Sequence, residues 1–417
     1  MTNPKRILIL FSDTGGGHRS AAEAIDEALG LSFPGRYDVS LVDVFQEYAP
    51  RPMARLAAAY PEMTRHPRAW GLGYRISNGH RRARALTAAA WPYVRTAVRR
   101  LVRERPADVI VSVHPLFIAP VIKALGENRA PFLTVVTDLM TTHALWYHRR
   151  VDLCLVPTEA AAQRALACGL RPDQVRVVGL PVARRFCQPR RDPAPLRQAL
   201  GWPIDRPMVL VVGGGEGMGP VFETAQAIAA RGTSQGAVFG LAVVAGRNRR
   251  LRRRLESAGW PVPNFVYGFE DRMPEMMQAA TLLVTKAGPL TVSEALNAGL
   301  PMVLYTRVPG QEDGNVQYVV EEGVGVWAPG PERAADAVLG WLTRPDDLAR
   351  AAAACRRVAS PEAALDVAAV IDSLASVGTL HRDENARRRS AGVAHEDRAT
   401  QGQSEIGDDV AEHVPYA

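Results

Sequence analysis

A histidine that directly follows three glycines is the first group in this chain that could do chemistry. Gly15, Gly16, Gly17 and His18 come after a short apolar run, and the residues that follow have the apolar spacing of a helix. Glycines at a strand-to-helix turn let a ligand approach the backbone, and the helix N-terminus offers unpaired N–H groups. An imidazole there could accept a proton at neutral pH; the alternative is a residue that only caps or solvates the first helical turn.

A second glycine-rich turn follows the apolar run at 208–212 and spans residues 213–219. Neither turn matches the G-x-G-x-x-G spacing of a dinucleotide site or the Lys-Ser/Thr pair of a Walker A motif. A dinucleotide site could still recruit Asp43, at the end of an apolar run, as a ribose ligand. Two such turns, each opening a domain, favour instead a ligand bound between the domains.

A dense group of polar residues follows within residues 284–315. A strand is predicted to end at Thr285, Gly288 turns the chain, and a helix is predicted to start near Thr291. The N-terminus of that helix can hold a diphosphate through backbone N–H groups, with the Thr291 hydroxyl as a further donor. Glu294, one turn later, can accept hydrogen bonds from two ribose hydroxyls; its alternative role is a partner of the helix dipole.

Three further polar residues, Gln311, Glu312 and Asn315, follow the next predicted strand. Each offers hydrogen-bonding groups to sugar hydroxyls, although Gln311 and Glu312 could also be exposed loop residues. Taken in this order, the side chains from Thr291 onward predict a nucleotide-sugar site that runs from ribose through phosphate to hexose.

Apolar runs that predict strands recur along the whole chain. They lie at 6–11, 38–44, 108–113, 132–136, 152–156 and 175–178, and again at 208–212, 239–245, 264–267, 281–284, 301–305 and 324–327. Helical segments separate them, which indicates βαβ units and parallel sheets. We expect an α/β fold of two doubly wound, Rossmann-like domains that face each other across a cleft, with ligands at the carboxyl ends of the strands.

Length and composition limit the possible classes. A chain of 417 residues indicates two domains, since single cores rarely exceed about 250–300 residues. No apolar stretch approaches the roughly 20 residues that span a bilayer, and the first apolar run is too short for a signal peptide. The four cysteines lack C-x-x-C spacing, against a zinc site or a disulfide framework. These features predict a cytoplasmic protein, and the polar segment 376–417 is expected to be disordered.

The segment 50–105 is too long for one crossover and predicts an inserted helical region. Residues 51–105 contain 13 arginines and only two acidic residues, and tryptophans and tyrosines are interleaved with the arginines. This composition suits an anionic membrane surface. Nucleic acid is a competing partner, and a solvated helical face in an arginine-rich protein is the third possibility.

The chain resembles the GT-B-fold glycosyltransferases related to MurG, and among them the monogalactosyldiacylglycerol synthases and diacylglycerol glucosyltransferases. The resemblance extends from residue 6 to about residue 320 and rests on SDTGGGHRSAAEAI, VSVHPL, TDL followed by His143 and WYH, GGGEGMGP, TKAGP with SEAL, and PGQEDGN. One position departs from the pattern: Leu290 stands where the family's TKAGPGT motif has its second glycine.

The resemblance implies an inverting transfer of a hexose from a UDP-sugar to diacylglycerol, which gives a β-monoglycosyldiacylglycerol. It implies a metal-independent reaction without a cofactor, and no D-x-D motif stands where a GT-A enzyme would hold manganese. His18 is expected to be the catalytic base, and Asp138 is expected to assist it or bind the acceptor, although Asp138 could equally cap a helix. The domains are expected to be residues 1–185, which bind acceptor and membrane, and 186–375, which bind the UDP-sugar.

The remaining site residues are assigned by the same resemblance. The acceptor-binding residues are Gly16, Gly17, His114 and His143. The donor-binding residues are Gly214, Gly215, Glu216, Gly268, Phe269, Gly288, Thr291, Glu294, Gln311, Glu312 and Asn315. An anionic membrane surface, rather than nucleic acid, becomes the expected partner, with the protein in the cytoplasm and peripherally bound to the inner face of the cell membrane.

More than one activity is compatible with these residues. Gln311 and Glu312 can bind hydroxyls of either epimer, so galactose is favoured over glucose only by the resemblance. A MurG-type transfer of N-acetylglucosamine to a lipid-linked acceptor is the nearest rival enzyme. A UDP-N-acetylglucosamine 2-epimerase and a non-catalytic UDP-sugar sensor at the membrane are two further candidates.

Overall fold

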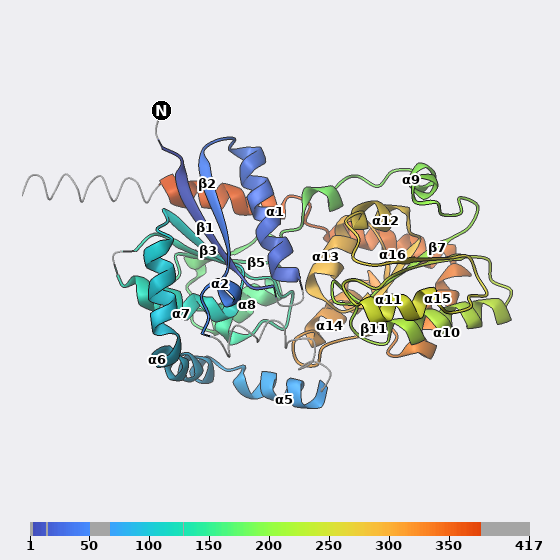
Figure 1. Ribbon diagram of the computed structural model, residues 1–417, viewed down its shortest axis with the longest axis horizontal. Coiled ribbons are helices and arrows are strands. Elements are labelled where there is room, and N and C mark those ends of the chain that lie inside the picture. The colour runs from blue at the N-terminus through green and yellow to red at the C-terminus, as the bar shows by residue number, and fades with distance from the viewer. Residues whose placement is uncertain (1–2, 14–15, 51–66, 128, 377–417) are drawn as a thin grey trace, which may run out of the picture.

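The chain forms two α/β domains, each built on a parallel sheet of six strands (Figure 1). The computed structural model describes residues 3–13, 16–50, 67–127 and 129–376. The strand orders are β2-β1-β3-β4-β5-β6 in the first sheet and β12-β11-β10-β7-β8-β9 in the second. The predicted fold, two Rossmann-like domains of the GT-B type, is confirmed.

The first sheet and its helices come from the N-terminal half of the chain. Its strands are β1 (Lys5–Phe11), β2 (Tyr37–Asp43), β3 (Val109–Ser112), β4 (Phe132–Val135), β5 (Leu153–Val156) and β6 (Val175–Val177). Its helices are α1 (Gly17–Ser32), α2 (Val44–Glu47), α5 (Pro67–Ser77), α6 (His80–Glu104), α7 (Pro115–Leu125) and α8 (Glu159–Ala167), with short 3-10 helices η1 (Ala144–Trp146) and η2 (Pro172–Gln174).

The second sheet comes from the C-terminal half. Its strands are β7 (Met208–Val212), β8 (Gly240–Val244), β9 (Asn264–Tyr267), β10 (Leu282–Lys286), β11 (Met302–Thr306) and β12 (Gly325–Trp327). The helices are α9 (Pro193–Leu200), α10 (Val221–Ser234), α11 (Arg249–Glu256), α12 (Met273–Ala279), α13 (Pro289–Asn297), α14 (Asp313–Glu321), α15 (Pro331–Leu342) and α16 (Pro345–Val358), with η3 (Arg184–Phe186) in the connection between the domains.

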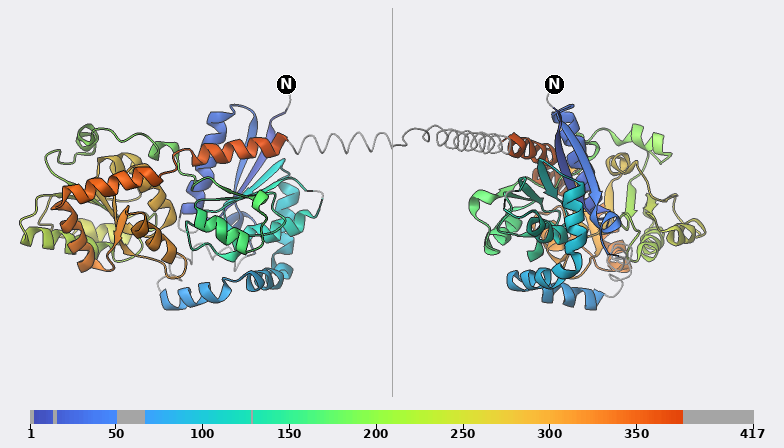
Figure 2. Two further views of the ribbon diagram at one scale, coloured as in Figure 1. Left: turned by 180° about the vertical axis from the view of Figure 1, so that it is seen from behind. Right: turned by 60° about the vertical axis from the view of Figure 1, so that its left-hand side comes forward.

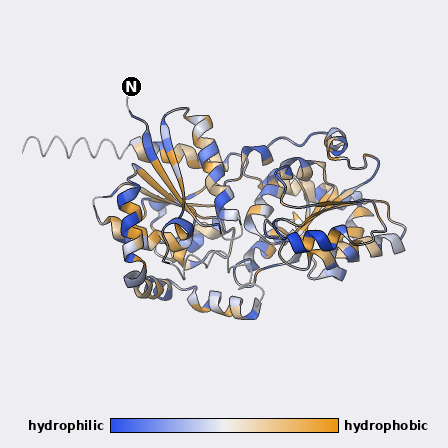
Figure 3. Cartoon of the chain, viewed as in Figure 1, coloured by the Kyte–Doolittle hydropathy of each residue, from blue (hydrophilic) through white to orange (hydrophobic). Residues whose placement is uncertain are grey.

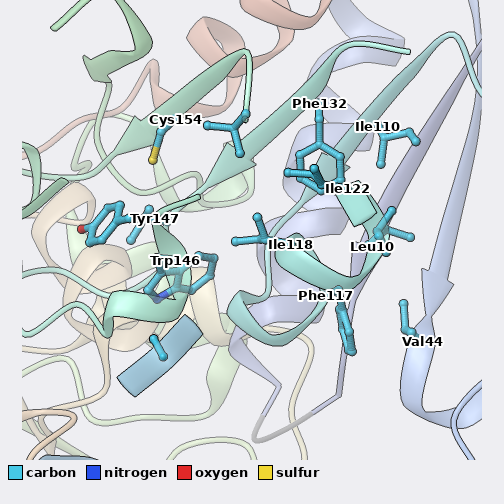
Figure 4. Packing of buried hydrophobic residues seen from close by; sticks show 14 of the residues in the cluster. Leu10, Val44, Ile110, Phe117, Ile118, Ile122, Phe132, Trp146, Tyr147 and Cys154 are labelled. Atoms are coloured by element: carbon cyan, nitrogen blue, oxygen red, sulfur yellow. The ribbon is translucent and has the colours of Figure 1, made fainter. Parts of the chain in front are cut away.

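Both sheets are buried on both faces, which explains why their strands are continuous apolar runs (Figure 3). In the first domain, α6 and α7 cover one face of the sheet. There Phe132 of β4 and Trp146 of η1 are fully buried together with Ile118 and Ile122 of α7 (Figure 4). This packing fixes the ends of β3 and β4, and His114 and Asp138 lie two and three residues beyond these ends.

In each sheet the order in which the strands follow one another along the chain reverses at one place, and the two places are equivalent. In the first sheet the order reverses between β1 and β3, and in the second it reverses between β7 and β10. Such switch points open a crevice at the carboxyl ends of the strands. All the glycine-rich motifs of the sequence follow these strands, and therefore they lie at the crevices of the two sheets.

The chain crosses back to the first domain at its end (Figure 2). A helix at 363–376 contributes Val367, Ala368 and Ile371 to the apolar cluster that also contains Ile7 and Ile9 of β1. The expected domain boundaries, 1–185 and 186–375, place this helix in the second domain. The apolar spacing of a helix does not indicate which domain it packs against. The tail expected to be disordered, apart from its first residue, lies outside the described residues.

The inserted region begins outside the described residues, which omit 51–66, and continues as α5 and α6. Within the described ranges no helix combines the length and the apolarity needed to cross a bilayer. α5 lies at the lower edge of the molecule in Figure 1, beneath the region where the two domains meet.

Candidate active site

A cleft of about 670 Å³ lies between the two domains and is lined from both sides. The first domain contributes Gly16, Gly17 and His18 at the start of α1. The second contributes the glycine-rich turn after β7 and the N-terminus of α13. Gly16 has φ of +84°, a left-handed conformation that favours glycine, and it is the N-cap of α1. The conformation of Gly16 turns the chain so that His18 enters the cleft.

The His18 imidazole is held by the ends of two neighbouring strands. Its Nδ1 lies 2.7 Å from the carbonyl oxygen of Val113 and 2.9 Å from the hydroxyl of Thr137. Because a carbonyl oxygen can only accept, Nδ1 carries the proton and donates it to Val113. The unprotonated nitrogen of the neutral ring is therefore Nε2, the atom that a general base needs.

A second histidine packs behind the first. The rings of His18 and His114 lie 4.6 Å apart between centroids, and His114 stacks on Phe117 at the same separation. Burial lowers the pKa of His18 to about 4, against the raising effect of the Val113 carbonyl. Burial also lowers the pKa of His114, and the neighbouring His18 lowers it further. Both imidazoles are therefore neutral at pH 7.

This pKa predicts an unusual pH profile for the reaction. Because a base must be unprotonated, we expect kcat/KM to remain high below pH 6.5, the ordinary pKa of histidine, and to fall only as the pH approaches about 4. The measurement is the pH dependence of initial rates in the Asp138→Asn variant, since Asp138 titrates nearby. If the rate of this variant instead falls near pH 6.5 as the solution is acidified, the loss of activity at low pH does not come from a His18 with a lowered pKa.

Asp138 lies at the cleft wall, three residues after the end of β4 and next to Thr137. Its Oδ2 accepts a hydrogen bond of 2.8 Å from Trp146 Nε1. Burial raises the pKa of Asp138 to about 6, while hydrogen bonds from Trp146 and Gln311 lower it and the charge of Glu312 raises it. Asp138 is therefore bonded to η1 and to the opposite domain rather than capping a helix.

The opposite wall is built from glycines and one lysine. α13 begins at Pro289, slightly earlier than predicted, because proline suits the first helical position. A Cβ on Gly288 would lie 2.7 Å from Lys286 Nζ, and one on Gly214 would lie 3.3 Å from Lys286 Cε. The lysine therefore lies between the two glycine turns, where backbone N–H groups and a cation meet.

Lys286 is paired within the protein. Its Nζ lies 2.5 Å from Oε1 of Glu312, a carboxylate that is buried and whose Oε2 accepts from the Val308 N–H at 2.8 Å. Asn315, also buried, donates to the carbonyl of Ala287 at 2.8 Å. Asn315 thus supports the turn that precedes α13 and does not line the cleft.

Glu294 stands one turn into α13, inside the cleft. Burial raises its pKa to about 8, while the charge of Arg185 lowers it. At pH 7 the group is therefore a neutral carboxylic acid, able both to donate and to accept. Leu290, the departure from the family motif, also lines the cleft, and its Cβ lies 3.8 Å from a Cβ placed on Gly17. The two domains come close to each other at this point.

The structure brings most of the sequence-predicted residues into this one cleft. Those that line it are Gly16, Gly17, His18, Asp138, Gly214, Gly215, Glu216, Phe269, Gly288, Thr291, Glu294, Gln311 and Glu312. Those that do not line it are His114, His143, Gly268 and Asn315. His114 packs behind His18, and a Cβ on Gly268 would lie 3.1 Å from Arg252 Nη1.

His143 faces a helix instead of the cleft. Its Nδ1 accepts from the Leu145 N–H at 3.1 Å, so Nε2 carries the proton and meets the hydroxyl of Ser77 at 3.1 Å. Its ring contacts Tyr74 edge-on at 5.0 Å between centroids. Burial, with the nearby charge of Arg164, lowers its pKa to about 4. His143 therefore holds α5 against the first domain through its contacts with Ser77 and Tyr74.

Among the cleft residues that were not predicted from the sequence are Lys286, Thr137 and Arg247. Arg247 bonds Glu216 at 2.9 Å and lies over the ring of Phe269 at 4.3 Å, which joins two predicted donor residues. A signal for Lys286 was available, since the chain has only three lysines among 50 basic residues and one stands inside the TKAGP motif. No local pattern marks Thr137 or Arg247, whose roles depend on contacts across strands.

Comparisons with solved structures agree with the fold. The chain superposes on MurG from Acinetobacter baumannii with a TM-score of 0.58 at 15% identity, covering 89% of this chain and all of that one. A UDP-GlcNAc 2-epimerase from Neisseria meningitidis gives 0.57 at 12% identity, with 88% and 100% covered. Because a transferase and an epimerase share this fold, the likeness alone does not decide the activity.

Relatives with higher sequence identity show the family to which the chain belongs. A probable monogalactosyldiacylglycerol synthase 2 from Oryza sativa subsp. japonica is 41% identical over 379 residues, 89% of this chain and 81% of the relative. Monogalactosyldiacylglycerol synthase 2 from Arabidopsis thaliana is 39% identical over 378 residues, with 89% and 81% covered. A probable monogalactosyldiacylglycerol synthase from Nicotiana tabacum is 38% identical over 372 residues, with 87% and 70% covered.

These relatives contradict the expected location. All three are named as chloroplastic proteins, so the expectation of a cytoplasmic enzyme at the inner face of a cell membrane is wrong. Composition, short apolar runs and scattered cysteines do not distinguish one reducing compartment from another. That is the reason for the error.

The family profiles cover both domains. Residues 18–182 match the profile described as "Monogalactosyldiacylglycerol (MGDG) synthase", and residues 208–333 match "Glycosyltransferase family 28 C-terminal domain". The first match begins at His18 and the second at the strand before the glycine-rich turn. The chain therefore belongs to the monogalactosyldiacylglycerol synthase family of glycosyltransferases.

Proposed function

We propose that the protein transfers galactose from UDP-galactose to diacylglycerol at a membrane surface, with inversion, to form β-monogalactosyldiacylglycerol. One observation carries the proposal: a single cleft holds a neutral imidazole with a free Nε2 on one wall and two glycine turns with Lys286 on the other. The first wall suits an acceptor hydroxyl, and the second suits a diphosphate. Relatives named monogalactosyldiacylglycerol synthases support galactose and diacylglycerol as the two substrates.

The donor nucleotide is assigned to the second domain. The diphosphate lies against the N-terminus of α13, where backbone N–H groups near Gly288 and the Thr291 hydroxyl donate to it. Glu294, neutral at pH 7, exchanges hydrogen bonds with the ribose hydroxyls. The glycines at 213–215 leave room for the phosphates to approach the backbone.

The sugar is assigned to the loop after β11. Gln311 and Glu312 both line the cleft, and the Gln311 amide also bonds Asp138 of the opposite domain. These groups lie between the two walls, where the hexose of a bound donor must be. Their hydrogen bonds to hydroxyls orient the anomeric carbon toward His18.

The transfer itself is a single displacement. The hydroxyl oxygen of diacylglycerol attacks the anomeric carbon while its proton moves to Nε2 of His18. The bond from the anomeric carbon to the UDP oxygen breaks, and UDP leaves with the electron pair. One attack from the face opposite UDP inverts the α-linked donor to a β-product. Backbone donors at α13 and the charge of Lys286 stabilise the negative charge that develops on UDP.

The outer face of α5 supports membrane association. Leu72 is 54% exposed and Ile76 is 56% exposed, one helical turn apart on the same face. Arg68 and Arg75, also exposed, flank them. Exposed apolar side chains bordered by arginine suit insertion into an anionic membrane surface.

The double variant Leu72→Asp/Ile76→Asp is expected to lose most of its affinity for vesicles. Full burial of such a side chain contributes about 1.5–3 kcal/mol, so the partition coefficient should fall at least about tenfold. Sedimentation with vesicles that contain phosphatidylglycerol measures it. Turnover with a short-chain, water-soluble diacylglycerol should persist.

The matched control uses two equally exposed apolar residues of the other domain. Val238 is 65% exposed and Val320 is 48% exposed. The variant Val238→Asp/Val320→Asp adds the same two charges and should sediment like the unmodified protein. Equal losses in both double variants would mean that added negative charge, not α5, weakens the binding.

The proposed activity is tested with UDP-galactose, UDP-glucose and their N-acetyl forms, each added to diacylglycerol vesicles. We expect a monoglycosyldiacylglycerol with UDP-galactose, β-linked by NMR. Product only with UDP-glucose would correct the sugar, and no glycolipid with any donor would overturn the proposal. Vesicle-free interconversion of N-acetyl donors would indicate an epimerase, and UDP binding without turnover would indicate a sensor.

A further inference from the structure

Helix α5 of the first domain packs against the loop of the second domain that carries Gln311 and Glu312. A Cβ on Gly71 would lie 3.0 Å from Pro309 Cβ and 3.4 Å from the Pro309 carbonyl oxygen. A Cβ on Gly310, whose φ is +83°, would lie 3.1 Å from the ring of Tyr74. The helix and the loop are therefore in direct contact, and a glycine on each side makes the close approach possible.

Thr141 joins α5 to the second domain by hydrogen bonds. The Tyr74 hydroxyl donates to the Thr141 carbonyl oxygen at 2.7 Å, and the Gly314 N–H donates to the Thr141 hydroxyl at 2.6 Å. Thr141 follows Asp138 by three residues, and Gly314 follows Glu312 by two. Thr141 therefore links α5 to the segments that follow Asp138 on one wall of the cleft and Glu312 on the other.

α5 also contacts its own domain. The Ser77 hydroxyl lies 3.1 Å from His143 Nε2, and the ring of Tyr74 packs edge-on against the same histidine. Asn78, just after the helix, accepts from the Ala144 N–H at 3.0 Å. The inner face of α5 thus binds the 141–144 segment, while its outer face carries the exposed Leu72 and Ile76.

The loop that α5 contacts carries the two side chains assigned above to the donor sugar. Its two side chains extend in different directions, Gln311 to Asp138 and Glu312 to Lys286. A shift of Pro309 and Gly310 would displace both side chains, since Gln311 directly follows Gly310 and Glu312 comes one residue later. The sugar-binding end of the cleft therefore depends on where α5 lies.

We propose that α5 is a positioning element that couples membrane docking to donor binding, with Gly71 and Tyr74 as its positioning residues. The inference rests on the proposed function, because it takes Gln311 and Glu312 to hold the donor sugar. Docking of the outer face on a bilayer holds α5 in place, and its inner face then holds the loop in the sugar-binding arrangement. Membrane binding should strengthen binding of UDP-galactose, and by linkage the donor should strengthen membrane binding.

The test compares two glycines of the same helix. Gly71 contacts Pro309, whereas a Cβ on Gly73 meets nothing within 4 Å. Gly71→Leu and Gly73→Leu therefore change helix propensity equally and differ in the contact with the loop. Tyr74→Phe, which removes only the hydroxyl bonded to Thr141, is a milder variant that serves if Gly71→Leu does not fold.

Binding is measured by calorimetry with UDP-galactose and with UDP, each with and without phosphatidylglycerol vesicles free of diacylglycerol. In the unmodified protein and in Gly73→Leu, vesicles should lower the Kd of UDP-galactose about fivefold or more and leave that of UDP unchanged. Gly71→Leu should lose this response and raise the KM for UDP-galactose about tenfold, with a weaker effect on UDP. Tyr74→Phe should show the same losses in smaller degree.

The outcomes separate the inference from the proposed function. If the unmodified protein forms no glycolipid with any donor, the proposed function fails and the inference fails with it. If the unmodified protein is active but vesicles leave its Kd for UDP-galactose unchanged, the coupling is refuted. If Gly71→Leu and Tyr74→Phe respond to vesicles like Gly73→Leu, these residues do not position the loop. A parallel loss of affinity for UDP and UDP-galactose would indicate a general structural defect, which also contradicts the inference.

Discussion

Replacing His18 with alanine is expected to lower kcat for glycolipid formation by about 10²–10⁴-fold, the usual contribution of a general base. The physical reason is specific to one nitrogen: Nδ1 is held by the Val113 carbonyl, so Nε2 is the free acceptor. Burial keeps the ring unprotonated at pH 7 because it lowers the pKa to about 4. The measurement is initial rate at saturating donor, together with the Kd for UDP by calorimetry.

The control is another partly buried histidine. His148 does not line the cleft, and burial and nearby arginines also lower its pKa to about 4. His148→Ala should change kcat little, and both variants should bind UDP like the unmodified protein, since UDP is assigned to the second domain. Full activity in His18→Ala would remove His18 from the mechanism.

The second large effect is expected from Lys286→Met. The substitution leaves the carboxylate of Glu312 buried without its cation, and such broken pairs cost about 3–5 kcal/mol. The free energy of unfolding, measured by denaturation in urea, should fall by about that amount. Activity should fall about 10²-fold or more, because the substitution also removes the charge that we propose to stabilise the departing UDP.

A second substitution separates these two consequences. The double variant Lys286→Met/Glu312→Gln removes the unpaired charge and keeps an amide that can accept from the Val308 N–H. We expect it to recover most of the stability and little of the activity. A double variant no more stable than Lys286→Met would show that the ion pair is not the source of the loss, and recovered activity would show that the lysine is not needed at the diphosphate.

Much of the fold was predictable from local patterns. Each of the twelve predicted apolar runs overlaps a strand, because strands covered on both faces must be apolar throughout and such runs are easy to recognise. Residue type also predicted the glycine turns before α1 and α13, although α13 begins at Pro289 and not near Thr291 as predicted. The return of the 363–376 helix to the first sheet was not predictable, since its apolar face could have covered either domain.

The candidate site was predicted less completely, and its histidines show why. All three candidate histidines lie in segments that follow strands, yet only His18 lines the cleft, while His114 packs on Phe117 and His143 bonds Ser77. A strand end limits where a backbone lies but not which way its side chain turns. That direction depends on the neighbours, and the neighbours come from other segments.

The sequence by itself determined the strands, the glycine turns at their carboxyl ends and the family, because each depends on residue types within a few positions of one another. Only the tertiary structure decided which groups meet. The Val113 carbonyl selects the His18 tautomer across 95 positions, Gln311 reaches Asp138 from the other domain, and α5 of the first domain contacts Pro309 of the second. These contacts join segments far apart in the chain, and their distances follow from the packing of two domains rather than from any local pattern.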